Sequence, residues 1–511
     1  MNGAESLVRT LLGSGVDTCF ANPGTSEMHF VAALDRIPGM RCVLGLFEGV
    51  VTGAADGYAR MTGRPAATLM HCGPGLANGL SNLHNARRAR SPIVNCVGDL
   101  ATYHRPLDAP LTADTEGWAR GVSAWVRTAR SAREVGADAA VAVQAARTSP
   151  GQIATLILPS DTCWDEGGEV APALPVPVAP EVAPFVVDVA RRLLLGGERV
   201  ALVLGSAALG EGALADAHRI AAATGALLIA PGQNARIARG RGRHPIERMP
   251  YPVEAGRALM AGVRHVILVG APAPAFFFAY PGKPGRPYPE DADVCVLARP
   301  EQDAPAALAA LAGELGAPAV PPPATERPDP ARGVITPESF ARSLAALLPE
   351  QAVVVDESLT FGRALFPPTH CAAPHDWIQL TGGSIGDGLP LATGAAMGAP
   401  GRRVVTLQAD GSALYTVQAL WTQARERLDV TTIIFNNRRY AILQGELIAV
   451  GANPGRTALD LMDLSNPDLD WVRIAEGFGV AAARAETMER LNDLLTQSCA
   501  QRGPFLIDLA V

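Results

Sequence analysis

Two short motifs near the carboxyl end of the chain combine oxygen-bearing side chains with glycine. The apolar run 403–407 leads into an Asp-Gly-Ser sequence at 410–412, and a second apolar run ends in the Asn-Asn pair at 436–437. Open α/β sheets bind ligands at the carboxyl ends of their strands, so we expect Asp410 and Asn437 to lie together. Mg²⁺ prefers hard oxygen donors and commonly takes one or two carboxylates together with phosphate groups. The pattern therefore predicts a Mg²⁺ site.

The same motif suits an anion as well as a metal. Glycine at position 411 allows close approach to the backbone. The N–H groups of Gly411 and Ser412 would open a helix, whose amino end favours negative charge. We expect the backbone carbonyl of Arg439 to be a third protein ligand of the metal. An isolated Asp-Gly-Ser is most often a turn, so this hypothesis depends on the strand-end positions of Asp410 and Asn437.

A glutamate near the amino end is the second candidate for chemistry. Glu48 follows the apolar run 42–47 and precedes GVVTGAADGYARMTG, which has the pattern of a helix. A carboxyl buried at that point would have a raised pKa and could hold or share a proton. The alternative is a glutamate that only complements the dipole in the first turn of a helix.

A histidine occupies a similar position. His71 follows the apolar run 66–70, and a Gly-Pro-Gly loop begins two residues later. An imidazole at the end of a strand can reach a pocket and take part in proton transfer. The alternative is a histidine packed in the core.

The elements that position these residues fall into three segments. A chain of 511 residues is too long for one hydrophobic core. Proline-rich stretches at 171–184 and 317–333 cannot sustain a helix or a central strand and are typical of linkers. They separate predicted domains at 1–170, 185–316 and 334–511. Each segment alternates short apolar runs with helical patterns, which predicts an α/β fold with three doubly wound parallel-sheet domains.

The composition excludes several classes of function. The net charge is −7 and Lys and Arg form no long run, which excludes an extended surface for nucleic acid. No apolar stretch reaches the roughly 20 residues of a membrane span, and the start MNGAESLVRTLL lacks the pattern of a secretory signal. The eight cysteines form no C-x-x-C pair, so we expect reduced thiols and a cytoplasmic protein.

Two of these stretches resemble signatures of one enzyme family. Residues 409–437 resemble the thiamine-diphosphate motif, in which Gly-Asp-Gly is followed after a gap of this size by Asn-Asn; the first glycine is Ala409 here. The string E-x₅-A-x-D-G-Y-A-R that begins at Glu48 resembles the signature of the family's pyrimidine-binding domain. The resemblance covers nearly the whole chain. It implies a pyrimidine-binding domain, a central Rossmann-like domain and a diphosphate- and Mg²⁺-binding domain, in that order.

The resemblance also implies which residues hold the cofactor. In the glycine-rich stretch GGSIGDGLPLATGAAMG, Ile385 would be the apolar wedge under the bent cofactor, and the Gly383 carbonyl would accept a hydrogen bond from the pyrimidine amino group. The hydroxyls of Ser358 and Thr360 would reach the diphosphate, and Tyr415 is a further expected contact. The alternative for the glycines is tight packing between a helix and a sheet.

Within the family, the chain looks closest to benzoylformate decarboxylase. FANPGTSEMHF matches that enzyme's first active-site turn and places Thr25 where it has a serine that contacts the substrate carboxylate. LMHCGPG places His71 at the position of a catalytic histidine. The match puts Phe277, or a neighbouring phenylalanine, where a second catalytic histidine stands. A phenyl ring cannot relay a proton, which favours carboligation over aldehyde release; alternatively, the phenylalanines at 276–278 only pack a domain boundary.

His104 lies in a loop, GDLATYHRPLDAPL, that lines the pocket in relatives. It could replace the missing base, although a histidine in a surface loop is the favoured interpretation. We expect no FAD, because 202–214 has glycines between a strand and a helix but lacks G-x-G-x-x-G and its acidic partner.

Together these features predict a thiamine-diphosphate- and Mg²⁺-dependent lyase or transferase that acts on a 2-oxo acid. The reaction is decarboxylation followed by protonation or by carboligation with an aldehyde or ketone acceptor, as in acetolactate synthase. The alternatives are a FAD-containing oxidase of the same fold and a catalytically idle structural or regulatory homologue. The family places its cofactor between the first domain of one subunit and the third of another, which implies a homodimer or homotetramer.

Overall fold

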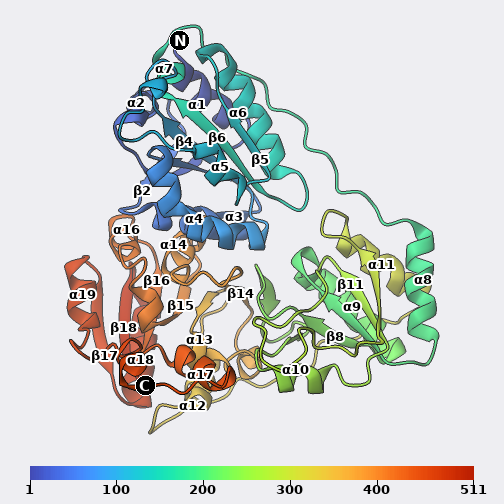
Figure 1. The fold of residues 1–511 in the computed structure, drawn as a ribbon. Coiled ribbons are helices and arrows are strands. Elements are labelled where there is room, and N and C mark those ends of the chain that lie inside the picture. Colours follow the sequence, from blue (N-terminus) through green and yellow to red (C-terminus); the bar gives the residue numbers. More distant parts are fainter.

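The computed structural model describes residues 1–511, and the chain builds three bodies, each around its own sheet. An extended stretch without helix or strand runs from the N-terminal body to α8 at the start of the central body (Figure 1). The expected α/β class with three doubly wound, mainly parallel sheets is confirmed. No helix combines the length and the apolar character that crossing a bilayer requires.

The N-terminal sheet has six parallel strands in the order β2-β1-β3-β4-β6-β5. Its strands are β1 (Thr18–Asn22), β2 (Arg41–Leu44), β3 (Ala66–Met70), β4 (Ile93–Asp99), β5 (Trp125–Thr128) and β6 (Ile153–Pro159). Its helices are α1 (Gly3–Gly13), η1 (Thr25–Glu27), α2 (Met28–Arg36), α3 (Glu48–Thr62), α4 (Cys72–Ala89), η2 (Arg105–Leu107), α5 (Thr115–Arg120), α6 (Ala132–Arg147) and α7 (Ser160–Trp164).

The central sheet has five parallel strands in the order β10-β8-β7-β11-β12. Its strands are β7 (Val200–Leu204), β8 (Leu227–Ala230), β10 (Glu247–Arg248), β11 (His265–Val269) and β12 (Asp293–Ala298). Its helices are α8 (Pro184–Leu195), η3 (Ser206–Leu209), α9 (Glu211–Thr224), α10 (Val253–Leu259) and α11 (Ala304–Glu314).

The C-terminal sheet has seven strands in the order β17-β18-β16-β15-β13-β14-β9, and only β9 is antiparallel to its neighbour. Its strands are β9 (Ile237–Arg239), β13 (Val353–Glu357), β14 (His375–Gln379), β15 (Val404–Ala409), β16 (Val430–Asn436), β17 (Ala481–Ala485) and β18 (Phe505–Ala510). Its helices are α12 (Pro337–Leu347), α13 (Leu359–Gly362), η4 (Pro368–Cys371), α14 (Gly388–Gly398), α15 (Asp410–Ala413), α16 (Ala419–Arg425), α17 (Ala441–Ala449), α18 (Arg456–Asp460), α19 (Trp471–Gly477) and α20 (Met488–Ala500).

The N- and C-terminal bodies meet where α3 crosses α14 (Figure 1). The two backbones approach closely through glycines: a β-carbon at Gly57 would lie 2.0 Å from the carbonyl oxygen of Leu391, and one at Gly394 would lie 1.8 Å from that of Ala54. Beside this crossing, buried Arg60 on α3 donates to Thr381, which precedes α14 in the chain. The position of α14 therefore depends on side chains of the N-terminal body.

Candidate active site

The predicted metal ligands lie at the ends of two adjacent strands. β15 and β16 are parallel neighbours, with Ala409 opposite Phe435, so Asp410 and Asn437 both follow at the carboxyl edge of the sheet. Asp410 is only 2% exposed. Its Oδ1 accepts from the N–H of Gly411 at 2.8 Å, and its Oδ2 accepts from the N–H of Arg438 at 2.6 Å. Burial raises the pKa of the Asp410 carboxyl, a shift that a bound cation would oppose.

The residues around Asp410 fit a divalent cation and an anion. Asn437 Oδ1 accepts from the N–H of Arg439 at 3.0 Å, so the two expected ligands share one tight turn. Gly411 leaves no room for a side chain, because a β-carbon there would lie 2.5 Å from the ring of Tyr440. Ser412 is buried in the first turn of α15. The set combines a carboxylate, an amide oxygen and a carbonyl, which are the hard donors that Mg²⁺ takes.

A cavity of about 450 Å³ adjoins these ligands. Asn437 and Arg439 are part of its wall, while Gln444 comes from α17. The other lining residues are Arg438, Leu459, Asp460, Asp463 and Ser465. Two of the three expected metal ligands, Asn437 and Arg439, therefore face open space, whereas Asp410 is not part of the wall.

The glycine-rich loop before α14 is held by a buried carboxylate that the sequence analysis missed. Glu357, the last residue of β13, accepts from the N–H groups of Gly386 at 2.7 Å and of Gly388 at 2.5 Å. Burial raises the pKa of the Glu357 carboxyl. Gly383 and Gly386 have φ of +77° and +91°, a conformation that favours glycine. Half-buried Ile385 lies in the loop that these contacts fix.

Helix α4 of the N-terminal body holds the same loop from the other side. Asn85 donates to the Ser384 carbonyl at 2.8 Å and accepts from the Ser384 N–H at 3.2 Å. Asn82 donates to the Gly386 carbonyl at 3.3 Å, and His84 Nε2 lies 3.1 Å from the Gly382 carbonyl. The expected cofactor loop is therefore positioned by two bodies of the same chain.

The expected diphosphate contacts differ in their surroundings. The Ser358 hydroxyl is buried and donates to Oδ1 of Asp356 at 2.5 Å. Thr360 is half-buried in α13. Tyr415 is exposed, and its β-carbon packs against the backbone of Gly386.

Glu48 and His71 are brought together in the N-terminal body. Glu48 is the first residue of α3 and is 8% exposed; its Oε2 accepts from Nδ2 of Asn78 at 3.0 Å. A β-carbon at Gly75 would lie 3.0 Å from Oε1 of Glu48 and 3.5 Å from the β-carbon of His71. Glycine at 75 therefore leaves the space that these two side chains share.

His71 has a buried acidic partner that the sequence analysis also missed. Its Nδ1 and Oε2 of Glu27 are 2.9 Å apart and share a hydrogen bond. Glu27 is 3% exposed, its Oε2 also accepts from the Gly24 N–H at 2.7 Å, and burial raises the pKa of its carboxyl. The sequence carried one signal for Glu27: it is an acid in a polar turn that follows a strand, and His71 also follows a strand. With Nδ1 engaged, Nε2 of His71 remains for other partners.

The remaining candidates of the N-terminal body are more exposed. Thr25 is exposed at the start of η1, and His104 is partly exposed before η2. The next residue, Arg105, pairs with buried Asp99 at 3.0 Å. A polar cavity of about 480 Å³ lies here, and His104 is not part of its wall. The lining residues are Thr102, Arg105, Glu116, Thr128, Ala129, Arg130 and Pro159.

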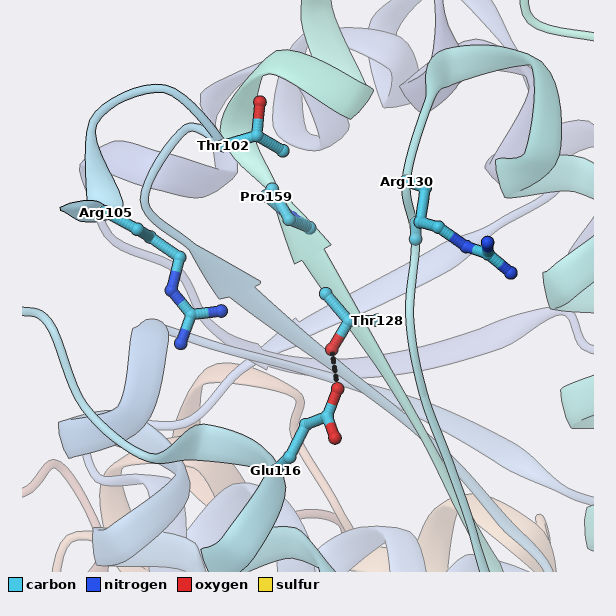
Figure 2. Close-up of a pocket in the computed structure, with 7 residues that line it drawn as sticks. Thr102, Arg105, Glu116, Thr128, Arg130 and Pro159 are labelled. Carbon is cyan, nitrogen blue, oxygen red and sulfur yellow. Dashed lines mark hydrogen bonds between the residues drawn. The ribbon is translucent and has the colours of Figure 1, made fainter.

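Figure 2 shows how this polar cavity is arranged. Thr128 donates to Glu116 at 2.6 Å, and the Arg105 side chain points into the same space, while Arg130 extends away from it. β4, β5 and β6 end at this cavity, so it occupies the same edge of the sheet as His71.

Phe277 lies on the expected cofactor loop. A β-carbon at Gly383 would be 2.5 Å from the Phe277 ring, so the ring rests on the Gly383 backbone. The Tyr251 ring lies 5.8 Å away between centroids. The hydroxyls of Tyr251 and Tyr280 both donate to Glu446 on α17, at 2.8 and 2.9 Å. These contacts connect the central body to a helix in which no residue is buried.

The comparisons with known proteins agree with this arrangement. Residues 1–118 match the family described as "Thiamine pyrophosphate enzyme, N-terminal TPP binding domain", and residues 363–509 match the corresponding "C-terminal TPP binding domain". The chain is 52% identical to "Putative acetolactate synthase large subunit IlvX" of Mycobacterium tuberculosis, over 100% of this chain and 99% of the relative. It is 30% identical to a benzoylformate decarboxylase of Pseudomonas aeruginosa, over 97% and 96%.

Solved structures show the same likeness. A thiamine diphosphate-dependent 4-hydroxybenzoylformate decarboxylase from Rhodococcus jostii RHA1 superposes with a TM-score of 0.85 at 26% identity. The superposition covers 99% of this chain and 98% of the other. All three bodies described above are therefore shared with that structure.

Proposed function

The chain belongs to the thiamine pyrophosphate enzyme family, and from this premise we propose that it is a Mg²⁺-dependent enzyme that decarboxylates a 2-oxo acid and joins the remaining fragment to a carbonyl acceptor. The observation that carries the proposal is the pair of oxygen ligands, Asp410 and Asn437, at adjacent strand ends. Burying the negative charge of a carboxylate is costly unless a cation lies beside it. An anion can therefore bind next to buried Asp410 only when a cation is also bound there.

The C-terminal body would hold the metal and the cofactor. Asp410, Asn437 and the carbonyl of Arg439 would bind Mg²⁺, and the N–H groups of Gly411 and Ser412 would face the diphosphate. Thiamine diphosphate supplies, when bound, the electron sink that allows a 2-oxo acid to lose CO₂. The Gly383 carbonyl and the half-buried Ile385 would orient the pyrimidine, in a loop that Glu357 and α4 hold in place.

Glu48 would move the proton that activates the cofactor. Asn78 fixes its Oε2, so Oε1 remains for proton exchange on the side where Gly75 leaves space. A carboxyl that is 8% exposed exchanges its proton with a bound partner more readily than with bulk water. This role needs the acid group itself and not only its shape.

His71 and Thr25 would handle the substrate. Glu27 holds Nδ1 of His71, which orients the ring and leaves Nε2 to bind the substrate carboxylate or the oxygen that becomes negative during the reaction. Exposed Thr25 begins the turn that carries Glu27, so its hydroxyl is available for the same carboxylate.

Phe277 favours carboligation over simple aldehyde release. Its ring rests on Gly383, beside the expected position of the reacting groups, and it can neither give nor take a proton. With slow protonation after CO₂ loss, a second carbonyl compound has time to react. The benzoylformate decarboxylase of Pseudomonas aeruginosa, at 30% identity, makes aldehyde release the second candidate outcome.

The test uses the full chain with thiamine diphosphate and Mg²⁺ and a panel of 2-oxo acids, each with and without an aldehyde or a second 2-oxo acid. CO₂ release and ketol formation are measured separately. We expect CO₂ release that requires both additions, and more ketol than free aldehyde when an acceptor is present. Asp410→Asn should abolish the Mg²⁺ dependence together with the activity. Lack of CO₂ release from every substrate would contradict the proposal.

We also propose that the active unit is a homodimer or homotetramer. The resemblance to the family implies that Glu48 of one subunit works with Asp410 of another. Light scattering during size-exclusion chromatography would give the mass directly, and a monomeric, fully active enzyme would contradict this assembly.

A further inference from the structure

Three side chains that can ligate metal meet beside the proposed substrate site. Glu27, His71 and Cys72 each offer one ligand atom, and these atoms all lie within 4.8 Å of one another. Glu27 ends η1, which follows β1, whereas His71 and Cys72 follow the neighbouring strand β3. The cluster is therefore set by the parallel pairing of two strands and not by one flexible loop.

The backbone places the Cys72 thiol in this cluster. Cys72 has φ of +51°, a left-handed conformation that non-glycine residues rarely adopt. Its side chain is buried, and its Sγ lies 3.3 Å from Oγ of Ser26, in the same turn as Glu27. A conformation of this kind persists only where the surrounding structure enforces it.

One oxygen of Glu27 has no hydrogen-bond partner. Oε2 is bonded to His71 and Gly24, but the buried Oε1 receives no donor. Position 98 must be glycine for this carboxylate to fit, because a β-carbon there would lie 1.6 Å from Oε1. A buried carboxylate oxygen without a donor is costly, and a cation would compensate it.

The donor set selects a different class of cation from the one expected at Asp410. A thiolate, an imidazole and a carboxylate are the ligands of Zn²⁺ and similar soft or borderline ions, whereas Mg²⁺ takes oxygen donors. Tetrahedral Zn²⁺ with these ligands holds its donor atoms about 3.3–3.6 Å apart, so no separation in the cluster must shorten by more than about 1.5 Å.

We propose that Glu27, His71 and Cys72 form an inhibitory site for a soft divalent cation of the Zn²⁺ class. The cation binds Cys72 as a thiolate and takes the lone pair of His71 Nδ1. The thiol proton, and the proton that Nδ1 shares with Glu27, are released to solvent. The imidazole is then held by the metal and no longer oriented by the carboxylate. Binding is independent of the proposed function, while inhibition rests on the role of His71 given above.

Binding is tested with Co²⁺ as a spectroscopic probe of the full chain loaded with thiamine diphosphate and Mg²⁺. A thiolate ligand gives Co²⁺ a charge-transfer band in the near ultraviolet. We expect this band at one equivalent per chain, its removal by added Zn²⁺, and its loss in Cys72→Ser. Calorimetry with Zn²⁺ should show at least a 10-fold weaker affinity for Cys72→Ser, because loss of even an outer-shell partner typically costs 10- to 100-fold.

The matched control is Cys295→Ser, which removes a partly exposed thiol on β12 of the central body. This variant should keep the band and the affinity. A Co²⁺ spectrum without a thiolate band, or Zn²⁺ binding that Cys72→Ser leaves unchanged, would overturn the site.

Inhibition is measured as the Zn²⁺ concentration that halves each variant's own rate. We expect Cys72→Ser to need at least 10-fold more Zn²⁺ than the unmodified chain or Cys295→Ser. Equal sensitivity of all three, despite the loss of binding in Cys72→Ser, would overturn the inhibitory role. Because the binding arm needs no turnover, failure of the proposed reaction and failure of the metal site are distinguishable.

Discussion

At the scale of single residues, the two side chains proposed to do chemistry in the N-terminal body are each held in place by a neighbour. Glu48 is fixed by Asn78, and His71 is fixed by Glu27. Gly75 borders Glu48, and Gly24 borders the ring of His71. A larger side chain at either glycine would collide with the residue beside it. The glycines therefore belong to the site as much as the ionisable groups do.

Replacing Glu48 by Gln should leave the cofactor bound but lower kcat about 100-fold or more, because an amide keeps the shape and loses the proton. Cofactor affinity is measured by calorimetry and kcat by CO₂ release. Glu5→Gln is the matched control, since Glu5 lies in the first turn of α1 and pairs with Arg36 on α2. A rate for Glu48→Gln equal to that of the unmodified chain would show that Glu48 acts in the same way as Glu5.

Replacing Phe277 by His should raise the ratio of aldehyde to ketol by at least about tenfold, because an imidazole on Gly383 can deliver a proton. Both products are quantified with an acceptor present. Phe278→His is the control: its ring meets the Phe277 ring edge to face, with 4.7 Å between centroids, but does not rest on Gly383. Equal ratios in the two variants would mean that Phe277 only packs the boundary between domains.

The positions of several candidate site residues could be predicted from the sequence, because their strands are apolar and end abruptly. Asp410, Asn437 and His71 all directly follow such runs, and the structure places them at strand ends. Glu27 and Glu357 also lie at or shortly after the ends of strands, but the sequence does not indicate which groups they hold. Their roles depend on contacts with His71 and with two backbone N–H groups, partners that come from other elements.

At the scale of elements, the apolar runs predicted most strands, but several were not predicted, and β14 and β9 show why. All five residues of β14, with the sequence HDWIQ, are buried, although three are polar. Asp376 in this strand is paired with Arg236 and Arg402, and burial lowers the pKa of His375 to about 3. Strand β9 is three residues long and borders β14. Such strands are stabilised by tertiary partners, which a local pattern cannot reveal.

The crossing of α3 and α14 gives an element-scale prediction. Gly57→Ala should destabilise the chain by about 1–3 kcal/mol, because the new β-carbon would lie 2.0 Å from the Leu391 carbonyl oxygen and push the helices apart. Thermal unfolding measures the effect. Gly212→Ala in α9, where a β-carbon meets nothing within 4 Å, should be neutral or slightly stabilising. Equal melting temperatures for the two variants would contradict the close crossing.

At the scale of the whole molecule, one arginine connects all three bodies. Arg236, just before β9, donates to both carboxylate oxygens of Asp376 at 3.0 and 3.1 Å. It also lies 3.3 Å from the carbonyl oxygens of Arg60 and Met61 at the end of α3 and donates to both. Arg402 donates to the same carboxylate at 2.6 Å. Asp376 is thus the acid on which the joint between the bodies depends.

The charge of Asp376 makes this joint sensitive to acid. Burial acts to raise the pKa of its carboxyl, but the hydrogen bonds and charges of Arg236 and Arg402 outweigh burial, and the pKa lies below its ordinary value of 3.8. A carboxyl with a lowered folded-state pKa stabilises the fold above its unfolded-state pKa, and the contribution is lost as the pH falls through the folded-state value.

Asp376→Asn should therefore lower the apparent melting temperature at pH 7 by at least about 2 °C, since two arginines lose a charged acceptor. The difference from the unmodified chain should begin to shrink below about pH 3.8, the ordinary pKa, and should be lost as the pH falls through the still lower folded-state pKa, where the native carboxyl is also protonated. Asp188→Asn is the control, because Asp188 makes solvated ion pairs with Arg191 and Arg192 on α8 and should change the melting temperature little. Two outcomes would show that the charge of Asp376 does not hold the three bodies together. One is a melting temperature of Asp376→Asn equal to that of the unmodified chain at pH 7; the other is a difference in melting temperature that stays unchanged in acid.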